Sequence, residues 1–240
     1  MDPTLGAMAT TSVATKKRRA WTTTVFVKQL MAVSGLFFVL FLLFHSYGNL
    51  KMFLGKEVYN DYAHWLKEEA FVPIFPHGGF IWVFRFAMVL MLVIHVWAAA
   101  VTWKRSRRAR SSRYVVKKSA ADAYAARTMR VSGVLLLFLI VFHILHFTTG
   151  TVRTGFAADS TPYDRMVASF QQPLMVIVYL VFVGFVCLHV SHGFWSAFQS
   201  LGWVRAGTRK FMVVLSGCVG GLIFVMFMLP PLAIAFGLIS

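Results

Sequence analysis

Five long stretches of almost unbroken hydrophobic residues divide the chain, at 26–48, 79–103, 131–149, 173–201 and 211–238. A helix rises about 1.5 Å per residue, so each stretch is long enough to cross a hydrocarbon core about 30 Å thick. The pattern predicts an all-α membrane protein in which five transmembrane helices form one bundle. Pro230 and Pro231 are expected to kink or end the last helix, because proline lacks the backbone donor that continues a helix.

The polar segments between these stretches differ sharply in their content of lysine and arginine. Five such residues occur up to Lys28, ten at 104–130 and three at 205–210, whereas 51–76 and 151–172 together hold five. Cytoplasmic connections of membrane proteins are enriched in these residues. We therefore expect a cytoplasmic N-terminus and a C-terminus outside. The chain would divide into a basic cytoplasmic tail, 1–27, and a membrane domain, 28–240.

Composition excludes a water-soluble globular domain, since 58% of the residues are hydrophobic and the mean hydropathy is +0.70. The formal net charge of +16 would suggest nucleic acid in a soluble protein. Here the basic residues lie between hydrophobic stretches, where they set orientation, so we expect a lipid bilayer and no nucleic acid as partner. The beginning of the chain is polar and basic and does not resemble a cleavable signal peptide.

Six of the eight histidines lie inside the hydrophobic stretches: His45, His95, His143, His146, His189 and His192. Strongly polar side chains are costly in hydrocarbon, so each needs a partner and is a candidate functional residue. A structural alternative exists for each one, because a neutral imidazole can hydrogen-bond to a neighbouring helix.

The depth of these histidines favours a shared function. With successive helices running in opposite directions, His45 and His143 fall in the outer half of the bundle, and His95 and His189 fall in the inner half. Depth alone does not separate His143 from the nearby His146, or His189 from His192. Two pairs of histidines from facing helices are thus predicted, one above the other.

Two imidazoles that approach from opposite directions can ligate the iron of a low-spin b haem. Four helices with histidines at two matched depths would hold two haem b groups. A proton relay would usually involve a carboxylate within the membrane, and all eight acidic residues lie outside the five stretches. Arg85 is a candidate partner for the propionates of the outer haem, and Arg130 for those of the inner haem.

The segments around these histidines resemble the single-chain cytochrome b subunit of bacterial succinate dehydrogenases and dihaem fumarate reductases. The resemblance rests on KQLMAVSGLFFVLFLLFHSYGNL, VIHVWAAA, RVSGVLLLFLIVFH and LHVSHGFWSAFQSLGW. It implies that His143 and His189 are ligands in preference to His146 and His192. The outer iron would then be held by His45 and His143, and the inner iron by His95 and His189.

The resemblance also implies a multi-pass anchor in the bacterial cytoplasmic (inner) membrane. A flavoprotein subunit and an iron–sulfur subunit would dock on its cytoplasmic face, and electrons from succinate would reach menaquinone or another quinone through the two haems. The dihaem fumarate reductases carry a glutamate just before a glycine pair at the outer start of the second helix. Here the sequence is FPHGGF, so we expect His77 to handle protons at an outer quinone site.

Three other interpretations stay open at this point. Cys187 and His189 form a C-x-H arrangement that, with Cys218, could belong to a Rieske-type [2Fe–2S] site, although a second C-x-x-H is missing. The chain could be a non-redox transporter or assembly scaffold whose histidines only bond across helices. It could also be another dihaem cytochrome, such as the membrane subunit of a hydrogenase or formate dehydrogenase.

Overall fold

The computed structural model describes residues 23–109 and 120–240, with the side chains of 120–126 excepted. All regular secondary structure in these residues is helical. Five long helices make up the bundle: α1 (Thr24–Leu50), α3 (Gly79–Arg108), α4 (Ala120–His143), α6 (Pro173–Ser200) and α7 (Arg209–Ala235). Each contributes all or most of its residues to a segment long and apolar enough to cross a membrane. The prediction of an all-α protein with five transmembrane helices is confirmed.

Shorter helices occupy the connections: η2 (Lys51–Leu54), α2 (Lys56–Glu68), α5 (Pro162–Phe170) and η4 (Ala206–Thr208). The π-helical segment η3 (Ile144–Thr148) instead continues α4 within the third hydrophobic stretch. Helix α1 begins at Thr24, after Thr23 caps it by accepting a hydrogen bond from the Phe26 amide at 3.2 Å. The predicted tail at 1–27 therefore overlaps the first turn of α1. Its residues 1–22 lie outside the described part of the chain.

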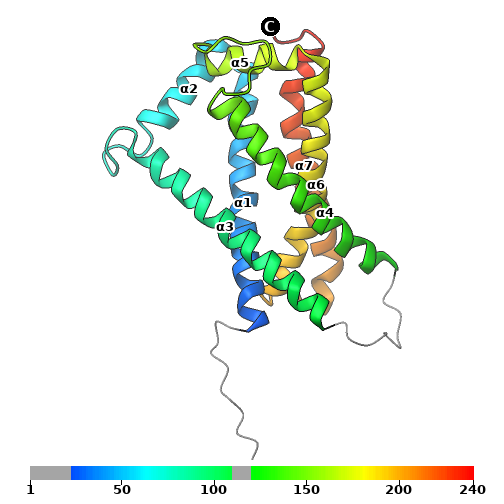
Figure 1. Cartoon of the computed structure of the whole chain (residues 1–240). Coiled ribbons are helices and arrows are strands. Elements are labelled where there is room, and N and C mark those ends of the chain that lie inside the picture. Colours follow the sequence, from blue (N-terminus) through cyan, green and yellow to red (C-terminus); the bar gives the residue numbers. More distant parts are fainter. Residues whose placement is uncertain (1–22, 110–119) are drawn as a thin grey trace, which may run out of the picture.

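The two ends of the bundle, which lie at the bottom and the top of Figure 1, differ in their content of basic residues. The start of α1, the end of α3 and η4 lie together at one end, which we call the basic end. It carries Arg105, Arg107 and Arg108 on α3 and Arg209 and Lys210 at the start of α7. The C-terminus lies at the opposite end beside α2 and α5, and we call this the α2–α5 end. The described residues that flank the connections rich in lysine and arginine thus lie at one end of the bundle.

Helix α1 is central in the bundle. It packs against α3, α6 and α7, while α6 packs against both α4 and α7. Val39 of α1, Val190 of α6 and Ile223 of α7 are buried together where these three helices meet. The fifth long helix, α7, therefore covers the side of α1 and α6 and completes the apolar interior.

Close packing of α6 on α7 depends on the absence of a side chain at Gly220. A Cβ atom there would lie 2.8 Å from the carbonyl oxygen of Cys187 and would also clash with the Ser191 side chain. Small residues allow helix backbones to approach closely in membranes, where packing replaces the hydrophobic effect as the source of association.

Helix α7 continues through Pro230 and Pro231 to Ala235, so the prolines do not end it. Both prolines are buried, as are Ala233 and Ile234 beyond them. Neighbouring helices support a proline-containing helix in a membrane protein, and local adjustments satisfy the freed backbone groups. Packing of the last turns therefore overrides the local cost of the prolines.

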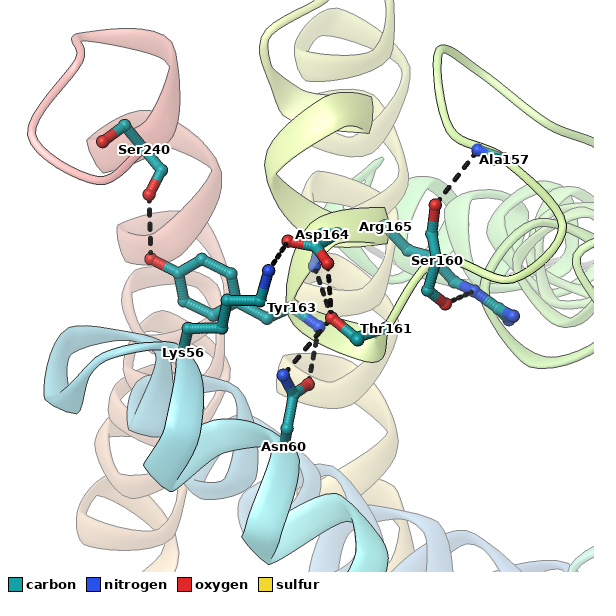
Figure 2. A network of polar contacts seen from close by, with 9 residues as sticks. All are labelled: Lys56, Asn60, Ala157, Ser160, Thr161, Tyr163, Asp164, Arg165 and Ser240. Atoms are coloured by element: carbon teal, nitrogen blue, oxygen red, sulfur yellow. Dashed lines mark hydrogen bonds and ion pairs between the residues drawn. The ribbon is translucent and has the colours of Figure 1, made fainter.

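A polar network ties the short helices together at the α2–α5 end (Figure 2). Thr161 caps α5 and accepts a hydrogen bond from the Asp164 amide, and Pro162 occupies the first helical position. Asn60 of α2 accepts a hydrogen bond from the Tyr163 amide at 3.1 Å. Lys56 lies 2.8 Å from the Asp164 carboxylate. Hydrogen bonds from Lys56 and Thr161 lower the pKa of Asp164, so this carboxyl group is charged at neutral pH.

We predict that Gly220→Ala destabilises the protein whereas Gly221→Ala does not. Both changes replace glycine by a better helix former, but only the first meets a neighbouring backbone, and nothing lies within 4 Å of a Cβ at Gly221. Overpacking of this kind costs about 1–3 kcal/mol. Unfolding of the two variants in detergent micelles measures the difference. Equal stability would show that α6 and α7 do not approach this closely.

Candidate functional site

The four histidines selected from the sequence meet as two pairs inside the bundle. The ring centres of His45 on α1 and His143 on α4 are 5.9 Å apart. Those of His95 on α3 and His189 on α6 are 6.3 Å apart. A metal ion held at about 2 Å by one nitrogen of each ring would place two ring centres about 6 Å apart. Both pairs therefore have the separation needed for two imidazoles to ligate one iron.

Each pair joins helices that lie diagonally across the bundle. The close neighbours among the four helices are α1 with α3, α1 with α6, and α4 with α6. The His45–His143 pair joins α1 to α4, and the His95–His189 pair joins α3 to α6. His95 of α3 lies beside Gly35 of α1, which precedes His45 on the same helix by ten residues. The two pairs are thus separated by about 15 Å along the helix axis.

A serine holds each ring of the pair nearer the basic end. Ser34 Oγ lies 3.1 Å from His95 Nδ1, and Ser132 Oγ lies 3.1 Å from His189 Nδ1. Both serines are only 1% exposed. The next residue in each helix is a glycine, and a Cβ atom on Gly35 would lie 3.3 Å from His95 Cε1.

Gly133 of α4 lies beside the His189 ring as Gly35 lies beside the His95 ring. A Cβ atom there would lie 3.4 Å from Cε1 of His189. A serine followed by a glycine therefore forms the seat of each imidazole: the hydroxyl binds Nδ1 and the missing side chain makes room for the ring.

Aromatic side chains surround the pair nearer the α2–α5 end. The His45 ring stacks on Phe41, with centres 5.2 Å apart and planes inclined by 12°. His143 Nδ1 lies 3.5 Å from the hydroxyl of Tyr179, at the limit of a hydrogen bond. This pair therefore has an apolar, weakly hydrogen-bonded surround, unlike the pair held by serines.

His146 has a different role from His143, although the two lie one turn apart. The π-helical segment η3 starts directly after His143, and His146 within it is fully buried. Its Nδ1 lies 2.9 Å from the Tyr179 hydroxyl, and its Nε2 lies 2.6 Å from Thr154 Oγ1 and 3.1 Å from Ser169 Oγ. Both ring nitrogens are occupied by protein groups, so His146 is a structural histidine in this arrangement.

The two arginines considered as propionate partners lie toward opposite ends of the bundle. The guanidinium group of Arg85 lies over the Trp82 ring at 4.8 Å, near the α2–α5 end. That of Arg130 lies over the Trp103 ring at 5.7 Å, near the basic end. Aromatic contacts of this kind hold a guanidinium group while leaving hydrogen-bond donors free.

A pocket of about 450 Å³ opens where α2 ends and α3 begins. His77 and Arg85 line it together with Lys67, Glu68 and Trp82. The Gly78 amide donates a hydrogen bond to the Glu68 carbonyl oxygen at 2.9 Å, and this bond fixes the end of α2 against the start of α3. A carboxylate, an imidazole and an aromatic ring thus line one pocket of a size that suits a small ligand.

Sequence reasoning missed Ser34, Ser132 and Glu68. A signal for the serines exists: Val-Ser-Gly occurs at 33–35 and at 131–133, and in both places a histidine follows ten residues after the glycine. The hydrophobic residues around this short motif conceal it. Glu68 had no comparable signal, because only the fold of the α2–α3 connection brings it beside Gly78.

The cysteines considered for an iron–sulfur cluster do not join the histidines in one site. Cys187 is half-buried on α6, and Cys218 is exposed on α7. Among the residues whose side chains are described, no three or more His, Cys, Asp or Glu residues are grouped so that they could hold a metal ion. A Rieske-type cluster requires four ligands together, and the geometry of these cysteines does not favour it.

Comparison with known proteins gives one family. A family model described as succinate dehydrogenase/fumarate reductase transmembrane subunit matches residues 104–228. The matched segment is just over half of the chain and includes His143 and His189, whereas His45 and His95 precede it. None of the curated proteins and none of the solved structures gives a match.

Proposed function

Because the chain belongs to the succinate dehydrogenase/fumarate reductase transmembrane subunit family, we propose that it is the cytochrome b anchor of such a complex. The observation that carries this proposal is the meeting of four histidines as two pairs with ring centres 5.9 and 6.3 Å apart. Histidines that serve only helix packing have no reason to face one another at the separation of two axial ligands.

In this proposal His45 and His143 hold one haem b, and His95 and His189 hold a second. When bound, haem b supplies one-electron transfer, which suits a subunit that connects soluble redox partners to a quinone in the membrane. Arg85 and Arg130 are near the two ends of the bundle and would neutralise propionates there. The aromatic and aliphatic side chains between the helices exclude water from both sites.

We propose that the basic end faces the cytoplasm of a bacterium and that the chain is an inner-membrane protein. The concentration of arginine and lysine at that end supports this orientation. The flavoprotein and iron–sulfur subunits would dock there, close to the His95–His189 pair. The chemistry of succinate or fumarate then belongs to those partners and not to this chain.

Quinone chemistry requires a group that accepts or donates protons near a membrane face. We assign this role to the pocket at the α2–α5 end, which is lined by His77, Glu68 and Arg85. His77 is exposed on the loop before α3, so it can exchange protons with water. Menaquinone or another quinone would enter beside Trp82, and the His77 imidazole would pass a proton from water to the quinone as the quinone is reduced to the quinol.

The pairing of histidines predicts that His95→Ala removes one haem and leaves the other. Removal of one axial ligand abolishes low-spin ligation at that iron, while the other pair lies about 15 Å away along the bundle. Reduced-minus-oxidised spectra and haem content per chain measure this loss. His192→Ala, one turn from His189, is the matched control and should retain both haems. Retention of both haems in His95→Ala would contradict the pairing.

The proposed quinone site predicts that His77→Ala slows quinone turnover about 100-fold or more while haem spectra stay unchanged. His64→Ala is the control, since His64 is an exposed histidine of α2 that does not line the pocket. Steady-state quinone reduction by the assembled complex measures the effect. Unchanged turnover in His77→Ala would remove His77 from the proposal, and an equal loss in both variants would point to a general effect on this end.

A further inference from the structure

The two serines beside the His95–His189 pair determine which nitrogen of each ring is available to a metal. Ser34 Oγ lies 2.8 Å from the carbonyl oxygen of Leu30 and 3.2 Å from that of Met31. A hydroxyl group has one hydrogen, and a carbonyl oxygen can only accept. The Ser34 hydrogen therefore goes to the backbone of α1, and its oxygen is left to accept a hydrogen bond from His95 Nδ1–H.

The same reasoning applies to Ser132 on α4. Its hydroxyl donates to the carbonyl oxygen of Met129 at 3.3 Å, so its oxygen accepts from His189 Nδ1–H at 3.1 Å. Both imidazoles then carry their proton on Nδ1 and keep a lone pair on Nε2. The second nitrogen of a metal-bound histidine is usually fixed by such a hydrogen bond.

We infer that Ser34 and Ser132 are positioning residues that present Nε2 of His95 and His189 to one iron and make both nitrogens stronger electron donors. This inference rests on the proposed haem function. A hydrogen bond from Nδ1–H increases the basicity of the ligating nitrogen, and a more basic ligand stabilises ferric over ferrous iron. The serines thereby lower the reduction potential of the haem held by this pair.

The other pair provides a contrast within the same molecule. The Tyr179 hydroxyl lies 3.5 Å from His143 Nδ1, and it also lies 2.9 Å from His146 Nδ1. The bond to His143 is correspondingly weak. His45 stacks on Phe41. The loss of the serines is thus expected to change the potential of the haem held by His95 and His189 and to leave that of the other haem unchanged.

The test is a redox titration of Ser34→Ala, Ser132→Ala and the double variant, with Ser216→Ala as control. Ser216 is a serine on α7 that is 3% exposed and bonds to the Val213 carbonyl oxygen, so its loss reproduces the packing change without a histidine partner. We expect the potential of one haem to rise while that of the other is unchanged. A tenfold change in the ratio of ferric to ferrous stability corresponds to about 59 mV for one electron.

Electron paramagnetic resonance of the low-spin ferric haems gives a second readout, because it responds to ligand basicity and orientation. Selective loss of one haem from the double variant, with the other retained, would also support the inference. Potentials and resonance signals identical to those of Ser216→Ala would overturn it. A wild-type chain without haem would instead contradict the proposed function, so the two failures are distinguishable.

Discussion

The burial of polar imidazole rings among hydrocarbon is the constraint on which this structure depends. An imidazole in a bilayer must find a partner for each nitrogen. No carboxylate lies in the five candidate spans, so neutral groups or a metal must supply these partners. His146 satisfies the requirement with three hydroxyl groups. His95 and His189 have one serine each on Nδ1 and face each other, and in the proposed function they share one iron.

The arrangement of a histidine held by a serine occurs twice, once in each half of the four-helix part of the bundle. Helices α1 and α3 form one half, and α4 and α6 form the other. In each half, the first helix carries a Ser-Gly pair near the basic end and a histidine eleven residues after the serine. The second helix runs back and carries the histidine whose Nδ1 lies beside that serine. One histidine from each half then meets its counterpart at each depth. The fifth helix lies outside this repeat and packs against α1 and α6.

Much of this architecture could be predicted because hydrophobic length and charge act along the sequence itself. The five helices and the end shared by the basic connections follow from those two patterns. Matched depth on antiparallel helices predicted one outer and one inner pair of histidines, and the resemblance to the cytochrome b subunits selected His143 and His189 within them. Depth alone could not exclude His146, because that choice depends on the π-helical turn after His143 and on hydroxyl groups from Thr154 and Ser169.

Other features depended on contacts between distant segments. The Thr-Pro-Tyr-Asp sequence at 161–164 is typical of a helix start. Helix α5 was missed because a search for stretches long enough to span a membrane does not consider a helix of nine residues. The continuation of α7 through Pro230 reflects packing that its local sequence opposes. Glu68 lies in the pocket with His77 only because α2 folds back onto the start of α3. The proposed haem sites therefore depend most on long-range geometry, because each histidine pair joins helices that are distant in the sequence.

The haem content of the purified chain tests that geometry most directly. Two haem b groups per polypeptide, measured from the pyridine haemochrome spectrum against protein concentration, is the result that two bis-histidine sites predict. A colourless chain, or one whose iron is accompanied by acid-labile sulfide in place of haem, would contradict the account.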